Sequence, residues 1–179
     1  MLTRVFVRIV IVFALAAMYL VLPARVPADN TAASPRKVAP EFVLNDANGA
    51  PVRLSAYKGK VVLLNFWATW CHGCQEEIPW FVQFESKYES NGLAVIGVSM
   101  DDDGWKSVKP FLEEKKLNYT VVIGNEPLGK LYGLSAMPMT LLIDREGKIA
   151  ASYSGVIDRG KCESELQALL GSAGKNMAK

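Results

Sequence analysis

The sequence has few of the residues that build metal and haem sites. Its 179 residues include one histidine, His72, and three cysteines. A structural zinc site takes four ligands, and the chain has only one closely spaced cysteine pair, Cys71 and Cys74. Haem attachment requires a histidine directly after such a pair, but Gln75 stands there. The sequence therefore predicts no metal site and no cofactor.

The chain also lacks the concentrated basic charge of a nucleic-acid-binding domain. Its 20 basic and 18 acidic residues give a formal net charge of +2. Residues 1–28 contain three arginines and no acidic residue, so the rest of the chain has 17 basic and 18 acidic residues, a net charge of −1. The basic excess belongs to the N-terminus, and nucleic acid is not an expected partner.

A long hydrophobic run is present only near the N-terminus. Arg4 and Arg8 precede an apolar run over 9–23, and Val26 and Ala28 offer the small side chains of a signal-peptidase site. The run is shorter than the roughly 20 apolar residues of a spanning helix, but neighbouring residues can extend it. A signal peptide and a membrane anchor both remain open. Either one predicts an extracytoplasmic protein, secreted or membrane-anchored in the periplasm or on the outer face of the cytoplasmic membrane.

The remaining chain alternates between expected strands and helices, which is typical of an α/β sheet. We divide it into a leader or anchor over 1–28, a polar linker over 29–38, one domain over 39–171 and a flexible tail over 172–179. Strands are expected over 60–67, 93–99, 119–123, 140–143 and 148–153, helices over 72–88, 101–116, 127–132 and 158–170, and a β-hairpin over 39–58. The strands over 60–67 and 93–99 are continuously apolar, which indicates central strands buried on both faces.

The cysteine pair stands where a buried strand gives way to a helix. A thiol at a helix N-terminus has a lowered pKa, and its thiolate is the species that attacks a disulfide. Cys74 lies about one helical turn after Cys71, so the two sulfurs can pair. So short a loop stabilises a fold poorly, which favours a reactive Cys71–Cys74 disulfide over a structural one. We expect Cys71 to be the exposed nucleophile and Cys74 the more buried resolving thiol.

The segment Phe66-Trp67-Ala68-Thr69-Trp70-Cys71-His72-Gly73-Cys74 resembles the active site of the thioredoxin superfamily. Pro79 matches the proline that kinks the active-site helix of that family. Pro138 matches its cis-proline, whose loop pairs with the extended chain of a client, the protein whose disulfide is exchanged. The resemblance implies a thioredoxin-like three-layer sandwich: a mixed central sheet with helices on both faces, to which an N-terminal β-hairpin is added.

Within that superfamily the chain is similar to the extracytoplasmic TlpA and ResA proteins, with a redoxin or AhpC/TSA-like domain. The similarity rests on the hairpin sequence, on Asn65 in place of the buried Asp of cytoplasmic thioredoxins, and on Glu77. It implies a thiol–disulfide oxidoreductase that reduces client disulfides in cytochrome c maturation or metal-centre assembly. Apocytochrome c is then a candidate client, and a membrane thiol protein would supply electrons. Disulfide oxidation or isomerisation is the alternative.

Glu77 is a candidate catalytic residue. It follows Cys74 by three residues, which places both on one face of the helix. A carboxylate with a raised pKa could accept the proton that Cys74 loses. The alternative is an ordinary solvated glutamate, as we expect for Glu76.

Four further residues are candidates for client binding: Trp70, His72, Met137 and Pro138. His72 departs from the family, which often has proline between the cysteines, and a cation there would stabilise the Cys71 thiolate and raise the reduction potential. Met139 stands where the family usually has threonine. Two methionines beside Pro138 offer a soft apolar surface that suits either client binding or ordinary packing.

Two other residues are expected to be structural. Trp67 should pack in the core under the site, and Cys162 should be a small buried hydrophobic residue or a spare thiol. A peroxidase of the Pro-x-x-x-Thr-x-x-Cys type is disfavoured, because Leu64 and Ala68 occupy the proline and threonine positions. A thioredoxin-fold copper carrier is also less favoured, since such carriers use a wider cysteine spacing and a distant histidine, although two thiolates do suit Cu(I).

Overall fold

The computed structural model describes residues 36–171. The expectations for the leader, for most of the linker and for the tail lie outside these residues. Its strands are β1 Val43–Asn45, β2 Pro51–Arg53, β3 Val61–Trp67, β4 Leu93–Ser99, β5 Thr120–Ile123, β6 Met139–Ile143 and β7 Ile149–Ser154. Its helices are α2 His72–Tyr88, α3 Trp105–Lys115, α4 Glu126–Tyr132 and α5 Arg159–Gly171, with short 3₁₀ turns at Leu54–Tyr57 and Glu89–Asn91. Within 36–171, no helix is long and apolar enough to cross a membrane.

The central sheet has five strands in the order β5-β4-β3-β6-β7. β3 pairs in parallel with β4, and β4 with β5, whereas β6 and β7 are antiparallel to their neighbours. Every residue of β3 and β4 is buried, as expected for central strands with continuous apolar sequences. β1 and β2 form the expected N-terminal hairpin as a separate antiparallel pair. The mixed sheet and the added hairpin confirm the predicted fold class.

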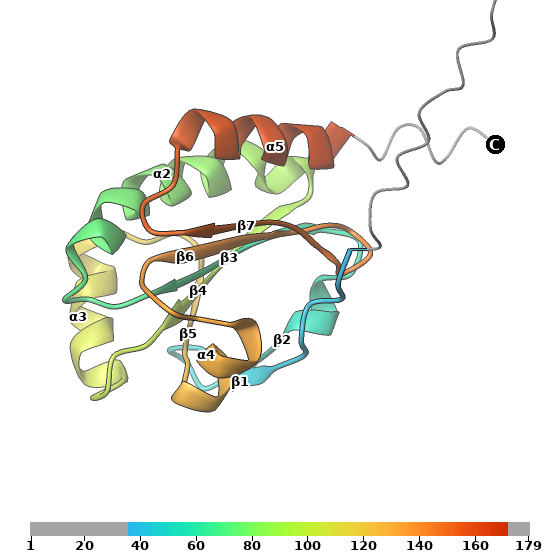
Figure 1. Cartoon of the computed structure of the whole chain (residues 1–179). Helices are drawn as coiled ribbons and strands as arrows, with labels where there is room; N and C mark the ends of the chain where they lie inside the picture. Colours follow the sequence, from blue (N-terminus) through green and yellow to red (C-terminus); the bar gives the residue numbers. More distant parts are fainter. Residues whose placement is uncertain (1–35, 172–179) are drawn as a thin grey trace, which may run out of the picture. The chain divides into compact units, whose positions relative to one another are not determined.

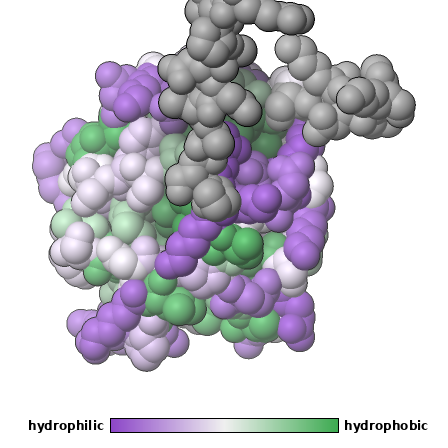
Figure 2. All heavy atoms as spheres, turned by 45° about the vertical axis from the view of Figure 1, so that its right-hand side comes forward, coloured by the Kyte–Doolittle hydropathy of each residue, from purple (hydrophilic) through white to green (hydrophobic). Residues whose placement is uncertain are grey.

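Helices cover both faces of the sheet (Figure 1). On one face, Phe81 and Phe84 of α2 and Leu166 of α5 pack with Leu63 and Val95 of the central strands. On the opposite face, a second core joins alternate residues of the same strands to Phe42 of the hairpin region and Leu128 of α4. On the face shown in Figure 2, hydrophilic residues are interspersed with hydrophobic ones. The helices and sheet therefore form the three layers expected of this fold.

Helix α2 positions the site. It begins one residue after Cys71, which is the N-cap, and its first turn follows directly on the loop from β3. The helix contains Pro79 and extends to Tyr88, as the sequence predicts. Gly92 then adopts a φ of +94°, a left-handed conformation in which glycine meets no Cβ penalty, and the chain turns into β4.

Helix α3 begins later than the sequence predicts. The sequence predicts that the acidic run starting at Asp101 forms its first turn, but the helix starts at Trp105. Asp101 instead lies in the loop after β4, buried, and accepts hydrogen bonds from Thr69 and Ser99. The carboxylate therefore organises the loop that precedes the cysteines and does not serve the helix dipole.

Candidate active site

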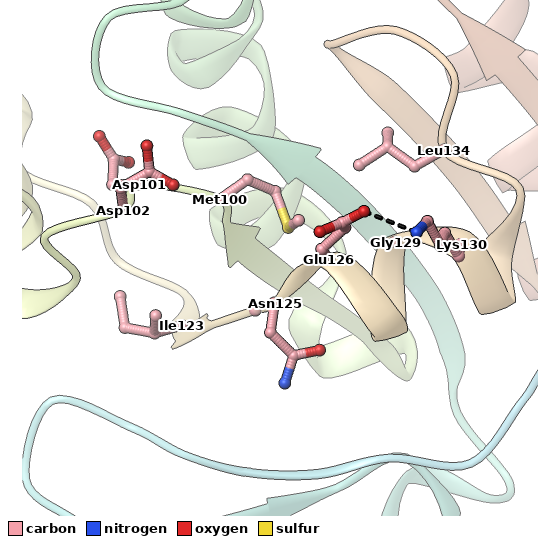
Figure 3. A pocket seen from close by; sticks show the side chains of 10 residues that line it. Met100, Asp101, Asp102, Ile123, Asn125, Glu126, Gly129, Lys130 and Leu134 are labelled. Carbon is pink, nitrogen blue, oxygen red and sulfur yellow. Dashed lines mark ion pairs between the residues drawn. The ribbon is translucent and has the colours of Figure 1, made fainter.

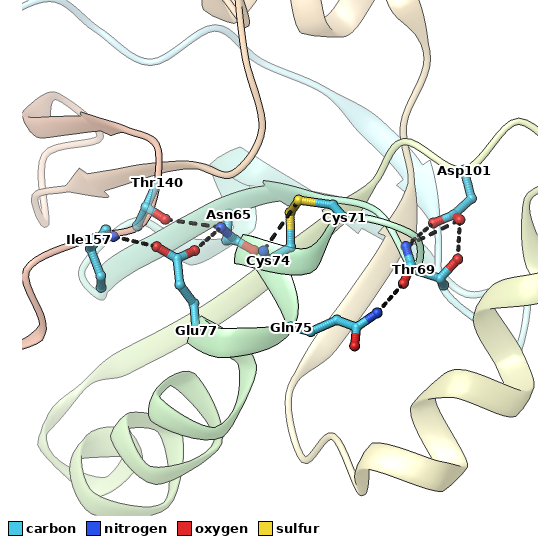
Figure 4. The surroundings of a disulfide bond; sticks show 9 residues. All are labelled: Asn65, Thr69, Cys71, Cys74, Gln75, Glu77, Asp101, Thr140 and Ile157. Carbon is cyan, nitrogen blue, oxygen red and sulfur yellow. Dashed lines mark hydrogen bonds between the residues drawn. A yellow bond between two sulfur atoms is a disulfide. The ribbon is translucent and has the colours of Figure 1, made fainter.

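Cys71 and Cys74 form a disulfide at the N-terminus of α2 (Figure 4). The Sγ of Cys71 accepts a hydrogen bond from the N–H of Cys74, at 3.3 Å, as an N-cap side chain does. Cys71 is 7% exposed and Cys74 is 1% exposed. Cys71 is therefore the more accessible residue of the pair, as expected, but it is much less exposed than the sequence suggests. Met137 and Ile78 belong to the apolar cluster around the pair.

The peptide bond between Met137 and Pro138 is cis, and it lies directly before β6. The N–H of Gly155 donates a 2.8 Å hydrogen bond to the carbonyl of Pro138. A Cβ on Gly73 would lie 3.5 Å from Cδ of Pro138, which places the proline in contact range of the dipeptide between the cysteines. The structure thus brings Pro138 to the cysteine pair although 64 residues separate it from Cys74.

Glu77 is fully buried, which contradicts the alternative hypothesis of an ordinary solvated glutamate. Its Oε1 accepts a 2.7 Å hydrogen bond from the N–H of Ile157, and its Oε2 lies 3.5 Å from Nδ2 of Asn65. The same Asn65 amide donates to Oγ1 of Thr140 at 3.0 Å. In Figure 4 the carboxylate points towards Asn65 and Ile157, and Asn65 lies on the side of the cysteines.

Burial raises the pKa of the Glu77 carboxyl from 4.5 to about 7. The hydrogen bonds from Ile157 and Asn65 act in the opposite direction, and the charge of Glu76 adds a smaller upward contribution. A carboxyl with a pKa near 7 exchanges protons readily at neutral pH. Glu76 itself is exposed, as expected, and its Oε1 lies 3.5 Å from Nε2 of His72.

The loop before the cysteines is held by contacts that the sequence did not indicate. Asp101 accepts bonds from the N–H of Thr69 at 3.0 Å and from its hydroxyl at 2.5 Å. Ser99 donates to the same carboxylate at 2.7 Å, and Gln75 donates to the Thr69 carbonyl at 2.6 Å. These bonds fix the chain between β3 and Cys71. In the sequence, the acidic run that contains Asp101 indicates a helix start and not these contacts.

The other sequence candidates divide into surface and core residues. Trp70 is 68% exposed and the side chain of His72 is 93% exposed, so both are available beside the disulfide. Met137 is half-buried and packs on the cluster that contains both cysteines. Trp67 is fully buried, and Cys162 is a buried free thiol. The last two agree with the structural roles expected of them.

A hollow of about 510 Å³ opens beside the ends of β4 and β5, next to this site (Figure 3). It is lined by Met100, Asp101, Asp102, Ile123, Gly124, Asn125, Glu126, Gly129, Lys130 and Leu134. Two of its carboxylates already have partners, because Asp101 holds Thr69 and Glu126 pairs with Lys130 at 2.6 Å. Its lining includes neither cysteine. In residues 36–171 no group of three or more His, Cys, Asp or Glu side chains is arranged to hold a metal.

A thioredoxin-like sheet with a Cys-x-x-Cys disulfide at the N-terminus of a helix defines a thiol–disulfide oxidoreductase. The comparisons with known proteins agree. The family model described as AhpC/TSA family matches residues 35–152, and the chain belongs to that family.

Named relatives place the chain more narrowly. It is 30% identical to the thiol-disulfide oxidoreductase ResA of Geobacillus thermodenitrificans over 162 residues, 90% of this chain and 92% of that one. It is 35% identical to ResA of Bacillus thuringiensis over 133 residues, 73% and 76% of the two chains. A Chlorobium tepidum structure with the provisional name thiol:disulfide interchange protein DsbE superposes with a TM-score of 0.72 at 34% identity, covering 75% of this chain and 96% of that one. The resemblance to the ResA group is confirmed.

Proposed function

We propose that the protein reduces disulfides of client proteins outside the cytoplasm, with Cys71 as nucleophile and Cys74 as resolving thiol. One observation carries the proposal: a disulfide at the N-cap of α2 has a fully buried carboxylate, Glu77, one turn further along the helix. The helix N-terminus favours a thiolate at Cys71, and the carboxylate offers a base for Cys74.

The reaction begins with the dithiol form. The Cys71 thiolate attacks one sulfur of the client disulfide, which forms a mixed disulfide and expels the first client thiolate. Cys74 transfers its proton to Glu77, and the new thiolate attacks Sγ of Cys71. The Cys71–Cys74 disulfide forms, the second client thiolate leaves, and the client has gained two electrons. A thiol donor must then reduce the pair for the next cycle.

The client chain is proposed to lie across the exposed rim of the site. Trp70 offers an exposed ring beside Cys71, and Met137 offers a half-buried apolar side chain that packs on the cluster containing both cysteines. The main chain next to Pro138 lies beside the dipeptide between the cysteines, within reach of an extended client chain. His72, almost fully exposed, would contact the client as well.

The partners and location follow from the same resemblance. The leader sequence and the similarity to ResA proteins support a place outside the cytoplasm, secreted or anchored to the membrane. Apocytochrome c, or a protein that receives a metal centre, is the proposed client. A membrane thiol protein is the proposed electron donor, because the disulfide must be reduced again in an oxidising compartment.

Disulfide oxidation is the second candidate, and His72 favours it. A protonated imidazole beside Cys71 would stabilise the thiolate and so the dithiol form. A stabilised dithiol form makes the disulfide a stronger oxidant, as in the strongly oxidising protein DsbA. The two candidates use the same residues and differ in the direction of electron flow.

A redox titration against a dithiol buffer, measured by thiol alkylation and mass, tests both. A potential of about −220 mV or lower supports the reductase, and a value near −120 mV supports the oxidase. Cys71→Ala and Cys74→Ala should each abolish reversible pairing, whereas Cys162→Ala, at the buried free thiol, should leave it unchanged. Failure of Cys71 and Cys74 to pair reversibly would reject thiol–disulfide exchange as the function.

A further inference from the structure

Three residues between β7 and α5, Gly155, Val156 and Ile157, lie against the active site. We call them the 155–157 loop. The N–H of Gly155 donates to the carbonyl of Pro138 at 2.8 Å. The N–H of Ile157 donates to Oε1 of Glu77 at 2.7 Å. The loop therefore contacts both the cis-proline and the buried carboxylate, and Val156 is the residue between these two contacts.

Val156 packs against the dipeptide between the cysteines. A Cβ on Gly73 would lie only 2.8 Å from Cγ2 of Val156, which is closer than two carbon atoms approach without displacement. Gly73 lies in the first turn of α2, where its conformation does not require glycine, since its φ is not positive. The missing side chain is therefore needed for close approach of the loop, not for the backbone of the helix.

The main chain after Val156 has little freedom to absorb a displacement. Ile157 is 5% exposed and packs with Phe81 and Cys162 in the core between α2 and α5. Its N–H is the donor at 2.7 Å in the Glu77 bond. A displacement of Val156 would therefore disturb the hydrogen bond that the N–H of the next residue, Ile157, donates to the Glu77 carboxylate.

We propose that the 155–157 loop is a positioning element that couples residue 73 to Glu77. Gly73 admits Val156 to the dipeptide, and the adjoining Ile157 N–H holds the carboxylate in place. The identity of the residue between the cysteines then governs the proton acceptor of the resolving step, besides any effect on the sulfurs. The catalytic consequence rests on the proposed function, whereas the coupling itself does not.

Other titratable groups act on the same carboxylate, and a test must allow for them. Glu76, on α2 itself, raises the pKa of Glu77. Burial is the main cause that raises the pKa of Tyr119, before β5, and that of Cys162 on α5, and the charge of Glu77 adds to both. Cys74 joins this set when the disulfide is reduced. The oxidised protein is the simpler state to titrate, because neither Cys71 nor Cys74 ionises in it.

The experiment is a ¹³C NMR titration of the Glu77 carboxyl in the oxidised full-length protein, with Glu77→Gln to assign the resonance. In Gly73→Ala we expect the pKa of Glu77 to rise by about one pH unit, because loss of a hydrogen bond to the ionised form favours the neutral form. Alanine suits a helix better than glycine does, so this variant should fold.

Two further variants make the result decisive. Gly160→Ala is the matched control: Gly160 is likewise the second residue of its helix, α5, but its Cβ would meet only Oδ1 of Asp158, at 3.5 Å. It should leave the pKa of Glu77 unchanged. In a Val156→Ala background, Gly73→Ala should no longer move the pKa, since the two atoms that clash are not both present.

An unchanged pKa in Gly73→Ala would overturn the proposal, because Val156 would then have rotated away without moving the loop. An equal rise in the pKa of Glu77 on Gly73→Ala in the parent and in the Val156→Ala background would overturn it too. These outcomes are independent of catalysis. If Glu77→Gln resolves mixed disulfides at the parent rate, the proposed role of Glu77 fails while the coupling measured by NMR still stands.

Discussion

Helix α2 carries two glutamates that accept hydrogen bonds from the main chain of other elements. Glu77 accepts from the N–H of Ile157 at 2.7 Å, and Glu85, eight residues later, accepts from the N–H of Val95 at 2.9 Å. Burial is the largest cause that raises the pKa of each. The two differ in depth and in surroundings, because Glu77 is fully buried and Glu85 only half-buried.

The difference bears on the catalytic role proposed for Glu77. A raised pKa and a main-chain hydrogen bond occur at both glutamates, so neither property by itself identifies the proposed proton acceptor. Only Glu77 lies one turn after Cys74 and beside Asn65, where a proton from the thiol could reach it. Glu85 is therefore a natural control for each experiment on Glu77.

The largest expected difference is in the resolving step. Glu77→Gln should slow the attack of Cys74 on the mixed disulfide by about 10²-fold, the lower range for loss of a general base. Glutamine keeps the shape but cannot take up the proton. The measurement is the lifetime of the mixed disulfide between Cys71 and a chromophoric thiol. It is followed by stopped flow after a disulfide of that thiol is mixed with the dithiol protein.

Glu85→Gln, in the same assay, should leave the lifetime within twofold of the parent. The first step, the attack of Cys71 on the client disulfide, should be unaffected in both variants. Equal lifetimes in the Glu77 and Glu85 variants would remove Glu77 from the mechanism.

The pH dependence of the resolving step sharpens the same comparison. Glu77 must be ionised to accept a proton, and its pKa is raised to about 7. The rate should therefore rise about tenfold per pH unit below pH 7 and level off above it. In Glu77→Gln this inflection should be absent, whereas Glu85→Gln should retain it. An inflection near pH 7 that persists in Glu77→Gln would assign it to another group.

The stability of the folded protein should change with pH in the direction opposite to that of the resolving rate. The folded pKa of Glu77, about 7, exceeds the unfolded value of 4.5, so the folded state binds more protons between these values. The free energy of unfolding should therefore fall as pH rises from about 4.5 to 7, by on the order of 3 kcal/mol from this group. Urea unfolding at pH 4.5 and 7.5 measures the decline.

Glu77→Gln and Glu85→Gln separate the contributions of the two carboxyl groups to this pH dependence. Glu77→Gln should remove most of the decline with pH, because glutamine does not titrate. Glu85→Gln should remove a smaller part, since Glu85 is less buried and its pKa is raised for the same reason. If the parent and Glu77→Gln show the same change in stability between pH 4.5 and 7.5, the pKa of Glu77 in the folded state is not raised.

The residues close together in sequence were predictable, and those brought together by the fold were not. Periodic spacing and the start of a helix suffice to place Cys71, Cys74 and Glu77, since all belong to one turn or the next of α2. The partners of Glu77 lie 12 residues before it in β3 and 80 residues after it in the 155–157 loop. No local pattern identifies a main-chain N–H as a partner.

Two errors have the same origin. The acidic run at Asp101 matches a helix N-terminus locally, but a tertiary partner, Thr69, takes the carboxylate instead. The sequence analysis also predicts that Cys71 is an exposed nucleophile. Packing by distant residues such as Met137 leaves it 7% exposed, and sequence spacing contains no information on that packing.

The smallest expected effect concerns Tyr119, a buried residue that feels the charges of both Glu77 and Glu85. Burial raises the pKa of its phenol, and the charges of Glu77 and Glu85 raise it further, so the hydroxyl stays protonated. That hydroxyl is buried without a hydrogen-bond partner among the described residues. Tyr119→Phe should therefore stabilise the protein by about 1 kcal/mol, because an unsatisfied polar group is removed and the ring is kept.

Tyr153→Phe is the matched control for this substitution. The hydroxyl of Tyr153 donates to Oε2 of Glu165 at 2.5 Å, so its removal should destabilise the protein by about 1 kcal/mol. Urea unfolding of both variants at pH 7 measures the two effects, which should have opposite signs. Destabilisation by Tyr119→Phe would mean that its hydroxyl binds a partner, and a bound water at the hydroxyl is the first to be sought by crystallography.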